Sequence, residues 1–501
     1  MRSRWPSRLG LSVAGSLAVA ALLVGPVSRA EVPTSRFAPH KRRWEQDVGG
    51  PEAARRLIHA RLAGWPDRFR VDAAELPRDD REFLWRVARD TWRGLSALRD
   101  RENGLPVDHV RFAPGSVDPA QAEIGDYTSV STVGLYAVAI VAARELGFID
   151  DTETVARLRQ TLGTLRELET WASMFFNYYD TTTLERTSEF LSFIDSAWLT
   201  AGAMVVRSTF PDLTQEVTER IQRRNHLFFY DESRGLMSHG YYVDQGRRSR
   251  NHYGVFYTEA RLGSLVAIGK GDVPELHWYK MTRTPPAGGQ GPVRVAPKPK
   301  RLSNGYEVFA GLCGWRDQLY VPSWGGSLFE ALMPSLLLDE QALAPRSLGR
   351  NGRIHVHVQR RYALEELGYP VWGMSPSMAP GAPRASAYRE YGVPVLGVLG
   401  YPALVVTPHA VALALPFEPE AATANLRRLA ELYPIYGAYG FYDAVDPRSG
   451  EVVPAYLALD QSMLFIALTN HLKDGVIQRR FAADPIAARA LPLLPVEDFF
   501  D

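Results

Sequence analysis

Apolar residues recur at three- and four-residue spacing along most of the chain, and this periodicity limits the fold more than any other feature. Such spacing gives a helix one apolar face. The pattern predicts about twelve helices in two series, and hence an all-α chain. The first series comprises residues 83–98, 130–146, 155–168, 194–210, 213–227 and 256–268. The second comprises residues 328–338, 354–367, 403–415, 421–432, 462–472 and 486–491.

The segment between the two series has a different composition. Residues 283–301, "RTPPAGGQGPVRVAPKPKR", hold five prolines and no apolar periodicity, which indicates an exposed excursion or linker. In the following segment, 306–321, aromatic and β-branched residues flank Arg316-Asp317 and predict a short β-hairpin. Two interpretations stay open: two helical domains, or one ring of paired helices with an insertion halfway round.

The first thirty residues have the pattern of a secretory signal peptide. Arg2, Arg4 and Arg8 precede an apolar run, residues 9–24, and Ser28-Arg29-Ala30 supplies small residues at a cleavage site. We therefore expect an exported and most simply periplasmic protein, with a polar N-terminal extension at 31–80. No later segment approaches eighteen consecutive apolar residues, so we expect no membrane span in the mature chain.

Charge and motif content exclude several classes of function. Without its first thirty residues the chain has 53 basic and 56 acidic side chains, which does not favour nucleic-acid or anionic-membrane binding. Cys313 is the only cysteine, so no internal disulfide can form. The chain has no HExxH, CxxC, GxxxxGK[ST] or GxSxG motif. We expect no cofactor, no metal and a monomer.

Several carboxylates stand among apolar and aromatic residues. Glu259 is predicted on the apolar face of its helix, Asp195 and Asp460 precede apolar residues by three and four positions, and Asp443 and Glu390 lie in aromatic loops. Paired carboxylates in partly apolar surroundings suit glycoside hydrolysis, in which one stays protonated and the other activates water.

Each of these acids also has a structural interpretation. Asp195 and Asp460 are equally compatible with helix N-caps, since Asp is a preferred cap residue. Glu259 could be ion-paired with Arg261 or another basic residue, and Arg261 could hold it ionised. Asp443 could be a turn residue near Asp446-Pro447.

A further acid, Glu330, lies in the apolar stretch "SWGGSLFEALMPSLL". It follows Ser327 by three residues, the spacing of a capping box, so its carboxylate is expected either to reach back to the backbone of Ser327 or to face a cleft. Trp324 and Tyr391 could cover the apolar face of a sugar while Arg389 binds its hydroxyls.

A set of motifs resembles the glycoamylase-like domain of bacterial proteins. These are, in order, "YTEARLGSLVAIGKGDVPELHW", "VPSWGGSLFEALMPSLLLDE", "APRSLGRN", "YPVWGMSPS", "YREYGV", "TPHAVALAL", "YGFYDAV" and "YLALDQSM". The region 91–210, with "ENGLPVDHV", "FFNYYDTTTLE" and "FIDSAWLTAG", resembles the helical half that commonly precedes that domain. The resemblance covers residues 83–472.

This resemblance implies an (α/α)6 toroid at 81–490, with halves at 81–282 and 323–490 around an insertion at 283–322. Relatives in the family include endo-β-1,2-glucanases, which implies a glucan substrate. By the same resemblance Glu259 is the general acid and Asp443 the base of an inverting reaction, for which carboxyl groups roughly 6.5–9.5 Å apart are expected. Asp195, Trp324, Glu330, Arg389, Glu390, Tyr391 and Asp460 are expected to bind substrate. The alternatives are a glycan-binding or envelope-assembly protein without catalysis, and a transglycosylase or lyase on the same fold.

Overall fold

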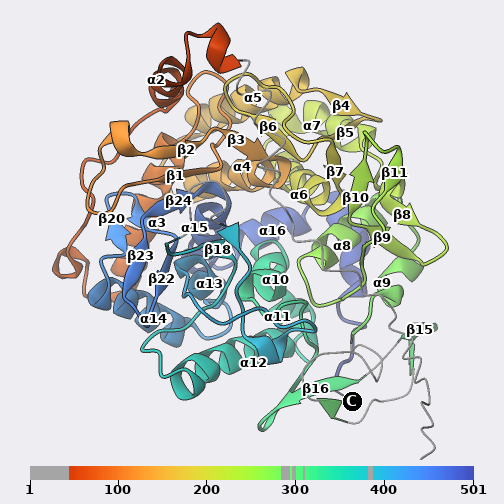
Figure 1. Ribbon diagram of the computed structural model, residues 1–501. Helices are drawn as coiled ribbons and strands as arrows, with labels where there is room; N and C mark the ends of the chain where they lie inside the picture. The colour runs from red at the N-terminus through yellow and green to blue at the C-terminus, as the bar shows by residue number, and fades with distance from the viewer. Residues whose placement is uncertain (1–43, 284–293, 296–300, 309–310, 382–387, 501) are drawn as a thin grey trace, which may run out of the picture.

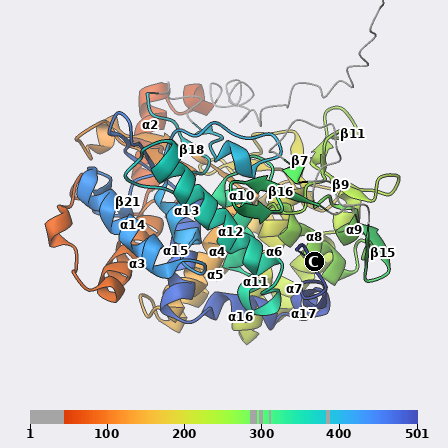
Figure 2. The same cartoon turned by 90° about the horizontal axis from the view of Figure 1, so that it is seen from below.

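The computed structural model describes residues 44–283, 294–295, 301–308, 311–381 and 388–500. The predicted signal peptide and most of the excursion at 283–301 lie outside these residues. The fold is rich in helices, and the chain passes once around the molecule before its last helices cross beneath it (Figures 1 and 2). Within the described residues, no helix combines the length and the apolar character needed to cross a membrane.

The helices before the excursion are α2 (Pro51–Arg61), α3 (Asp80–Ala97), α4 (Val130–Glu145), α5 (Asp151–Glu167), α6 (Phe193–Thr209), α7 (Thr214–Arg223), α8 (Ala260–Lys270) and α9 (Leu276–Lys280). Those after it are α10 (Leu328–Leu332), α11 (Glu340–Leu343), α12 (Leu348–Arg361), α13 (Pro408–Leu413), α14 (Pro419–Leu432), α15 (Ala458–Leu472), α16 (Val476–Ala482) and α17 (Pro485–Ala490). A 3-10 turn, η5 (Met333–Leu336), extends α10, and a π-helical turn, η6 (Tyr362–Glu366), extends α12.

Some helices are buried on every side and others only on one face. Thirteen of the 16 residues of α4 and 13 of the 15 of α15 are buried, whereas only six of the 17 residues of α5 are. A helix that is apolar all round must lie inside the molecule, while one with a polar face can cover it. The helices α4 and α15 are therefore interior, and α5 lies on the outside.

The packing partners extend this division. Each interior helix packs against the next in the order α8, α6, α4, α15, α13 and α10. The covering helices α7, α5, α3, α14 and α12 pack against α6, α4, α15, α13 and α10, respectively. The backbones of α4 and α6 approach closely, because a Cβ atom on Gly202 would lie 2.3 Å from the carbonyl oxygen of Gly134. Two glycines thus permit the close contact between α4 and α6.

Helix boundaries differ from the sequence prediction where proline or a loop intervenes. The helix expected at 403–415 is reduced to α13, since Pro408 opens it and Val406 pairs with Val445 instead. The helix expected at 328–338 changes to a 3-10 turn that contains Pro334. The helix expected to begin at 256 begins at Ala260.

The all-α expectation is incomplete, since short antiparallel strands join the helices. The three-stranded sheets are β2 (Glu123–Gly125), β1 (His109–Arg111) and β24 (Ala455–Leu457); β11 (Arg247–Arg248), β10 (Gly240–Tyr242) and β7 (Phe190–Ser192); β12 (His252–Tyr253), β9 (Leu236–Ser238) and β8 (Tyr230–Asp231); and β13 (Arg294–Val295), β16 (Leu312–Trp315) and β17 (Gln318–Tyr320). The pairs are β14 (Arg301–Ser303) with β15 (Tyr306–Val308), β18 (Ser377–Met378) with β19 (Tyr388–Arg389), β20 (Tyr436–Gly437) with β21 (Gly440–Phe441), β22 (Ala444–Asp446) with β23 (Glu451–Val453), β3 (Tyr127–Ser129) with β6 (Tyr178–Asp180), and β4 (Thr170–Trp171) with β5 (Met174–Phe175).

The strands β16 and β17 pair on either side of Arg316-Asp317, where Arg316 has a φ of 51°. Other strands gather at one end of the helices: Figure 2 shows β7, β11 and β18 on the side opposite α16 and α17. Strands β3, β7 and β24 run directly into the interior helices α4, α6 and α15. This end of the molecule therefore carries the N-termini of interior helices.

Candidate active site

Four of the predicted acids lie at the first turns of interior helices. Asp195 is the third residue of α6, Glu330 the third of α10 and Asp460 the third of α15, while Glu259 directly precedes α8. A helix N-terminus carries a partial positive charge and unpaired N–H groups, and it favours an acidic side chain. The strands and turns that precede these helices bring side chains from distant segments to one end of the fold.

Glu259 lies outside its helix, and its side chain is half-buried. It occupies the residue before α8, which corrects its predicted position inside a helix that begins at 256. Its Oε2 is buried and has no hydrogen-bond partner among the described residues. Burial, followed by the nearby Glu330 carboxylate, raises the pKa of Glu259 to about 8. A carboxyl group with this pKa is protonated at neutral pH, as a general acid requires.

Arg261 does not form an ion pair with Glu259. Its Nε and Nη2 donate to the two carboxylate oxygens of Glu340 at 2.7 and 2.9 Å. Its Nη1 and Nη2 also donate to the carbonyl oxygens of Thr258 and Ala331. The guanidinium charge lowers the pKa of Glu259, but less than burial raises it. The interpretation of Glu259 as the ion-pair partner of Arg261 is therefore wrong, and Arg261 joins α8 to α10 and α11.

Only one half of the predicted capping box forms between Ser327 and Glu330. Ser327 is the N-cap of α10, and its hydroxyl accepts from the backbone N–H of Glu330. The carboxylate of Glu330, however, accepts from the backbone N–H of Gly325 at 2.8 Å and from the Ser323 hydroxyl at 3.1 Å. Burial raises the pKa of Glu330 to about 7, and these two hydrogen bonds act in the opposite direction. The carboxylate thus binds the glycine loop before the helix.

Asp195 is not the N-cap of its helix. Ser192 holds that position, and its hydroxyl accepts from the backbone N–H of Asp195. The Asp195 carboxylate accepts from the Ser131 hydroxyl, on the second residue of α4. Burial raises the pKa of Asp195. Asp195 is half-buried, so this carboxylate joins two interior helices while part of it faces outward.

Asp443 and Asp460 form a second, deeper group. Asp443 lies between β21 and β22, its Oδ2 accepts from the backbone N–H of Met378 at 2.7 Å, and burial raises its pKa. Asp460 does not cap α15, because the cap position is Leu457. His409 Nδ1 lies 3.5 Å from Asp460 Oδ2. One atom of each of the three side chains lies within 4.8 Å of the other two, so the group is compact enough to share a proton or a small cation.

Tyrosine side chains connect the two groups of acids electrostatically. The pKa of Tyr253 is raised by burial and by Glu259 and Asp195, and that of Tyr401 by burial and by Glu330, Glu390 and Glu259. Burial, Asp460, Asp443 and Glu390 are among the causes that raise the pKa of Tyr388. Because such effects decay over short distances, these acids belong to one region of the molecule.

The remaining predicted residues differ in exposure. Trp324 is half-buried in the loop before α10, and Arg389 and Glu390 are exposed at and just after β19. Tyr391 is only 5% exposed and packs in a small apolar cluster with Met378 and Val405. Trp324, Arg389 and Glu390 are therefore accessible to a ligand, whereas the Tyr391 ring is a packing element.

Sequence reasoning missed three residues that contact these acids. Ser131 donates to Asp195, Tyr401 opposes the burial that raises the pKa of Glu330 and of Glu390, and His409 lies beside Asp460. The Tyr401 ring lies against Gly325, where a Cβ atom would meet it at 2.0 Å. No local pattern marks Ser131, Tyr401 or His409, because each reaches its partner only through tertiary packing.

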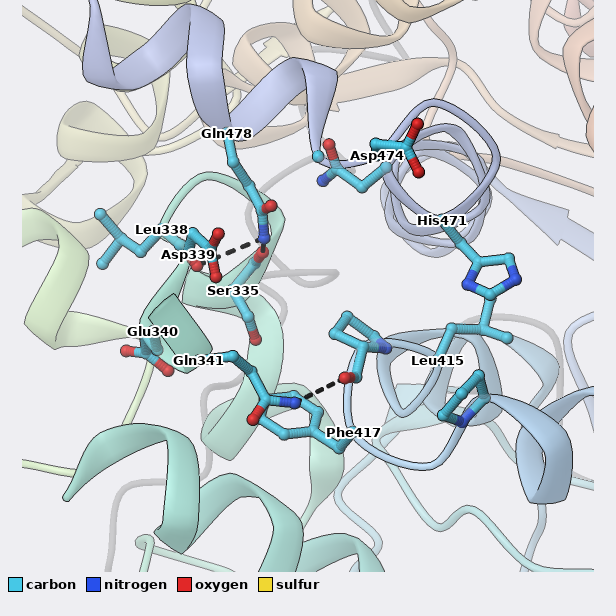
Figure 3. Close-up of a pocket in the computed structure, with 14 residues that line it drawn as sticks. Ser335, Leu338, Asp339, Glu340, Gln341, Leu415, Phe417, His471, Asp474 and Gln478 are labelled. Carbon is cyan, nitrogen blue, oxygen red and sulfur yellow. Dashed lines mark hydrogen bonds between the residues drawn. The ribbon is translucent and has the colours of Figure 1, made fainter. Parts of the chain in front are cut away.

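A cavity of about 310 Å³ lies elsewhere, among η5, α11, the α13–α14 connection and α15–α16 (Figure 3). None of the nine predicted site residues lines it. Its amide side chains are engaged in the wall itself, since Gln478 donates to the Ser335 carbonyl and Gln341 to the Pro416 carbonyl. The cavity is therefore distinct from the acidic region.

Substitution of Glu330 by glutamine is expected to move the basic limb of the pH–rate profile to lower pH. The general-acid role that the resemblance implies for Glu259 requires a protonated carboxyl group, so activity is expected below its pKa and should be lost as pH rises through that value. The Glu330 carboxylate raises this pKa, as Asp195 does more weakly, while Arg261 lowers it. Removing the Glu330 charge therefore lowers the pKa of Glu259. Profiles of kcat/KM for both proteins measure the shift.

Glu390→Gln is the matched control for this substitution. Glu390 raises the pKa of Glu330, whereas the causes of the Glu259 shift do not include it. The control should leave the basic limb where it is. A basic limb that stays unchanged in Glu330→Gln would contradict the electrostatic coupling of Glu330 to Glu259.

Comparison with known proteins gives matches for both halves of the chain. Residues 306–485 match the family described as "Putative glucoamylase", and residues 86–242 match a family of proteins of unknown function (DUF3131). The resemblance to the glycoamylase-like family is confirmed. A curated relative is the cyclic β-(1,2)-glucan synthase NdvB of Rhizobium meliloti (strain 1021), which is 26% identical over 82% of this chain. The chain spans 18% of the length of that relative.

Solved structures share the fold at lower identity. The endo-β-1,2-glucanase of Chitinophaga pinensis, solved with sophorotriose and glucose, is 16% identical, with a TM-score of 0.64 over 84% of this chain and 99% of its own. A glucoamylase-like protein of Bacteroides caccae is also 16% identical, with a TM-score of 0.63 over 83% of this chain and 99% of its own. These structures establish a glucoamylase-like helical fold.

Proposed function

We propose that the protein is an exported glycoside hydrolase that cleaves a bacterial β-glucan, with β-1,2-glucan favoured. The proposed catalytic domain is residues 81–490, a single (α/α)6 ring built from both helical series, and residues 1–30 would direct export to the periplasm. The fold shared with endo-β-1,2-glucanases supports the class of substrate. The observation that carries the proposal is the half-buried Glu259 side chain, whose Oε2 lies in the interior and whose pKa of about 8 suits a proton donor.

The proposed mechanism is an inverting hydrolysis by Glu259 and Asp443. Glu259 donates its proton to the glycosidic oxygen as the bond to the anomeric carbon breaks, and Asp443 takes a proton from the attacking water. The backbone N–H of Met378 supports the ionised form of Asp443. Inversion needs carboxyl groups roughly 6.5–9.5 Å apart, which leaves room for this water.

The proposed substrate contacts come from residues around Glu259. Trp324 would cover the apolar face of a glucose ring, and Asp195, Glu330, Arg389 and Glu390 would bind hydroxyl groups. Asp460 and Tyr391 are buried, so they would not contact the sugar directly. Asp460 would act on Asp443, and Tyr391 would support the loops around it.

The experiment is to incubate the purified protein with linear β-1,2-glucan and to follow the anomeric signals of the first products by NMR. The expected result is shorter glucans with an α-anomeric reducing end, the inverted configuration. Newly formed β-anomers would reject the inverting mechanism, and binding without any product would reject the hydrolase. Cyclic β-1,2-glucan as a second substrate tests endo action, because a ring has no chain end.

A transglycosylase is the second candidate function. It is favoured by the match to a cyclic β-(1,2)-glucan synthase over 82% of this chain. The same incubation separates the two, since a transferase yields longer or cyclic glucans and no net increase in reducing ends.

A further inference from the structure

Asp443 and Asp460 lie side by side in the interior, where one carboxylate oxygen of each and a ring nitrogen of His409 lie within 4.8 Å of one another. Each side chain is only 1% exposed. Both oxygens of Asp460 and Oδ1 of Asp443 are buried, and no described residue donates an N–H or O–H to them. Two ionised carboxylates in such contact would repel each other in a poorly solvated site, whereas one proton between them converts the repulsion into a hydrogen bond.

The surroundings of the two groups differ, and they determine which residue holds the proton. Asp443 accepts from the backbone N–H of Met378, and Arg111 and His109 also favour its ionised form. Within the described part of the chain Asp460 has no such donor, and the charge of a further acid, Asp108, also disfavours its ionised form. The ionised form is therefore better supported on Asp443, and the proton belongs on Asp460.

Two neighbouring side chains could in principle change this assignment. His409 is an alternative holder of the proton, since its Nδ1 lies 3.5 Å from Asp460, but burial lowers its pKa to about 3. Tyr388 interacts with both acids, and its pKa is raised well above the usual value by burial and by these charges. Both therefore stay neutral near pH 7, and neither supplies a charge to the pair.

We propose that Asp443 and Asp460 hold a single proton between them, carried by Asp460, and that Asp460 is the positioning residue for Asp443. This inference rests on the proposed role of Asp443 as the base. The O–H of Asp460 donates to one oxygen of Asp443 and fixes the orientation of the carboxylate. During hydrolysis the water oxygen bonds to the anomeric carbon, its proton goes to Asp443 and the Glu259 proton goes to the leaving oxygen. The proton of Asp460 is not consumed.

Two substitutions of similar size distinguish a protonated Asp460, which donates a hydrogen bond to Asp443, from an ionised Asp460. Asp460→Asn keeps an N–H donor toward Asp443, whereas Asp460→Leu removes it. The base must be ionised, so activity is lost as pH falls through the pKa of Asp443. The expected result is an acidic limb of kcat/KM that stays in place in Asp460→Asn and moves upward by about one unit or more in Asp460→Leu, which is about a tenfold loss below the limb. An acidic limb that moves downward by a unit in Asp460→Asn would show that Asp460 is ionised, and would overturn the proposal.

A measurement without substrate tests the shared proton independently of the reaction. The infrared difference spectrum between the wild type and Asp460→Asn at pH 7 should contain the C=O stretch of one buried protonated carboxyl group. Asp484→Asn is the matched control, because Asp484 is buried and ion-paired with Arg207 at 2.7 Å, so its loss should remove carboxylate bands only.

The two measurements distinguish failure of this inference from failure of the proposed function. If the protonated band is absent from the difference spectrum, Asp460 does not hold the proton and the inference is overturned. If the band is present but Asp460→Leu leaves the pH profile unchanged, the shared proton is supported and Asp443 is not the base. A stoichiometric divalent cation, detected by elemental analysis of the wild type and lost in Asp460→Asn, would also overturn the inference, because the cation would replace the proton.

Discussion

Replacement of Glu259 by glutamine is expected to lower kcat/KM for β-1,2-glucan by about 10²- to 10⁴-fold, the usual contribution of a general acid. Glutamine has nearly the same shape but no acidic proton. Because the wild-type carboxyl group is protonated at neutral pH, the substitution removes no buried charge there. Substrate binding and folding should therefore change little, and steady-state kinetics together with a thermal unfolding curve measure both effects.

The leaving group provides the control for this prediction. A β-1,2-glucosyl substrate with a nitrophenolate leaving group needs little protonation, so the loss in Glu259→Gln should be much smaller for it than for the glucan. An equal loss on both substrates would indicate damage to the site rather than loss of the acid. Undiminished activity on the glucan would remove Glu259 from the mechanism.

Replacement of Arg261 by methionine is expected to destabilise the fold by about 3–5 kcal/mol, because a buried partner is left as an uncompensated charge. Arg261 and Glu340 are 0% and 1% exposed and form two hydrogen bonds with each other. The substitution also leaves the carbonyl oxygens of Thr258 and Ala331 without this donor. Equilibrium unfolding in urea at pH 7 measures the change in the free energy of unfolding.

The double substitution Arg261→Met with Glu340→Leu is the control. It removes the charge together with its partner, so it should recover a large part of the lost stability, since apolar groups can replace a buried ion pair. A loss below about 1 kcal/mol in the single variant would contradict a tightly bound pair. The loss matters for function because the same guanidinium joins α10 and α11 to α8, the helix that follows Glu259.

Much of the helical framework could be predicted from the sequence. The apolar runs that became α4 and α15 predicted their boundaries to within a few residues, since long apolar periodic segments have few alternatives to helix. The short helix α13 was overestimated because Pro408 and the pairing of Val406 with Val445 interrupt an apolar run. The strands between helices were largely missed, since two- and three-residue pairings leave no periodic pattern.

The sequence by itself determined which acids are unusual. Glu259, Glu330 and Asp460 stand in apolar stretches, and an acidic side chain is rarely buried in such a stretch unless it is paired. Only the tertiary structure decided the neighbour of each. Arg261 binds Glu340 and not Glu259, the Glu330 carboxylate binds Gly325 and not Ser327, and one oxygen of Asp460 lies within 4.8 Å of one of Asp443. The physical reason is that spacing along a helix fixes the face on which a side chain lies, whereas a hydrogen-bond partner or a shifted pKa depends on groups brought together from distant segments by packing.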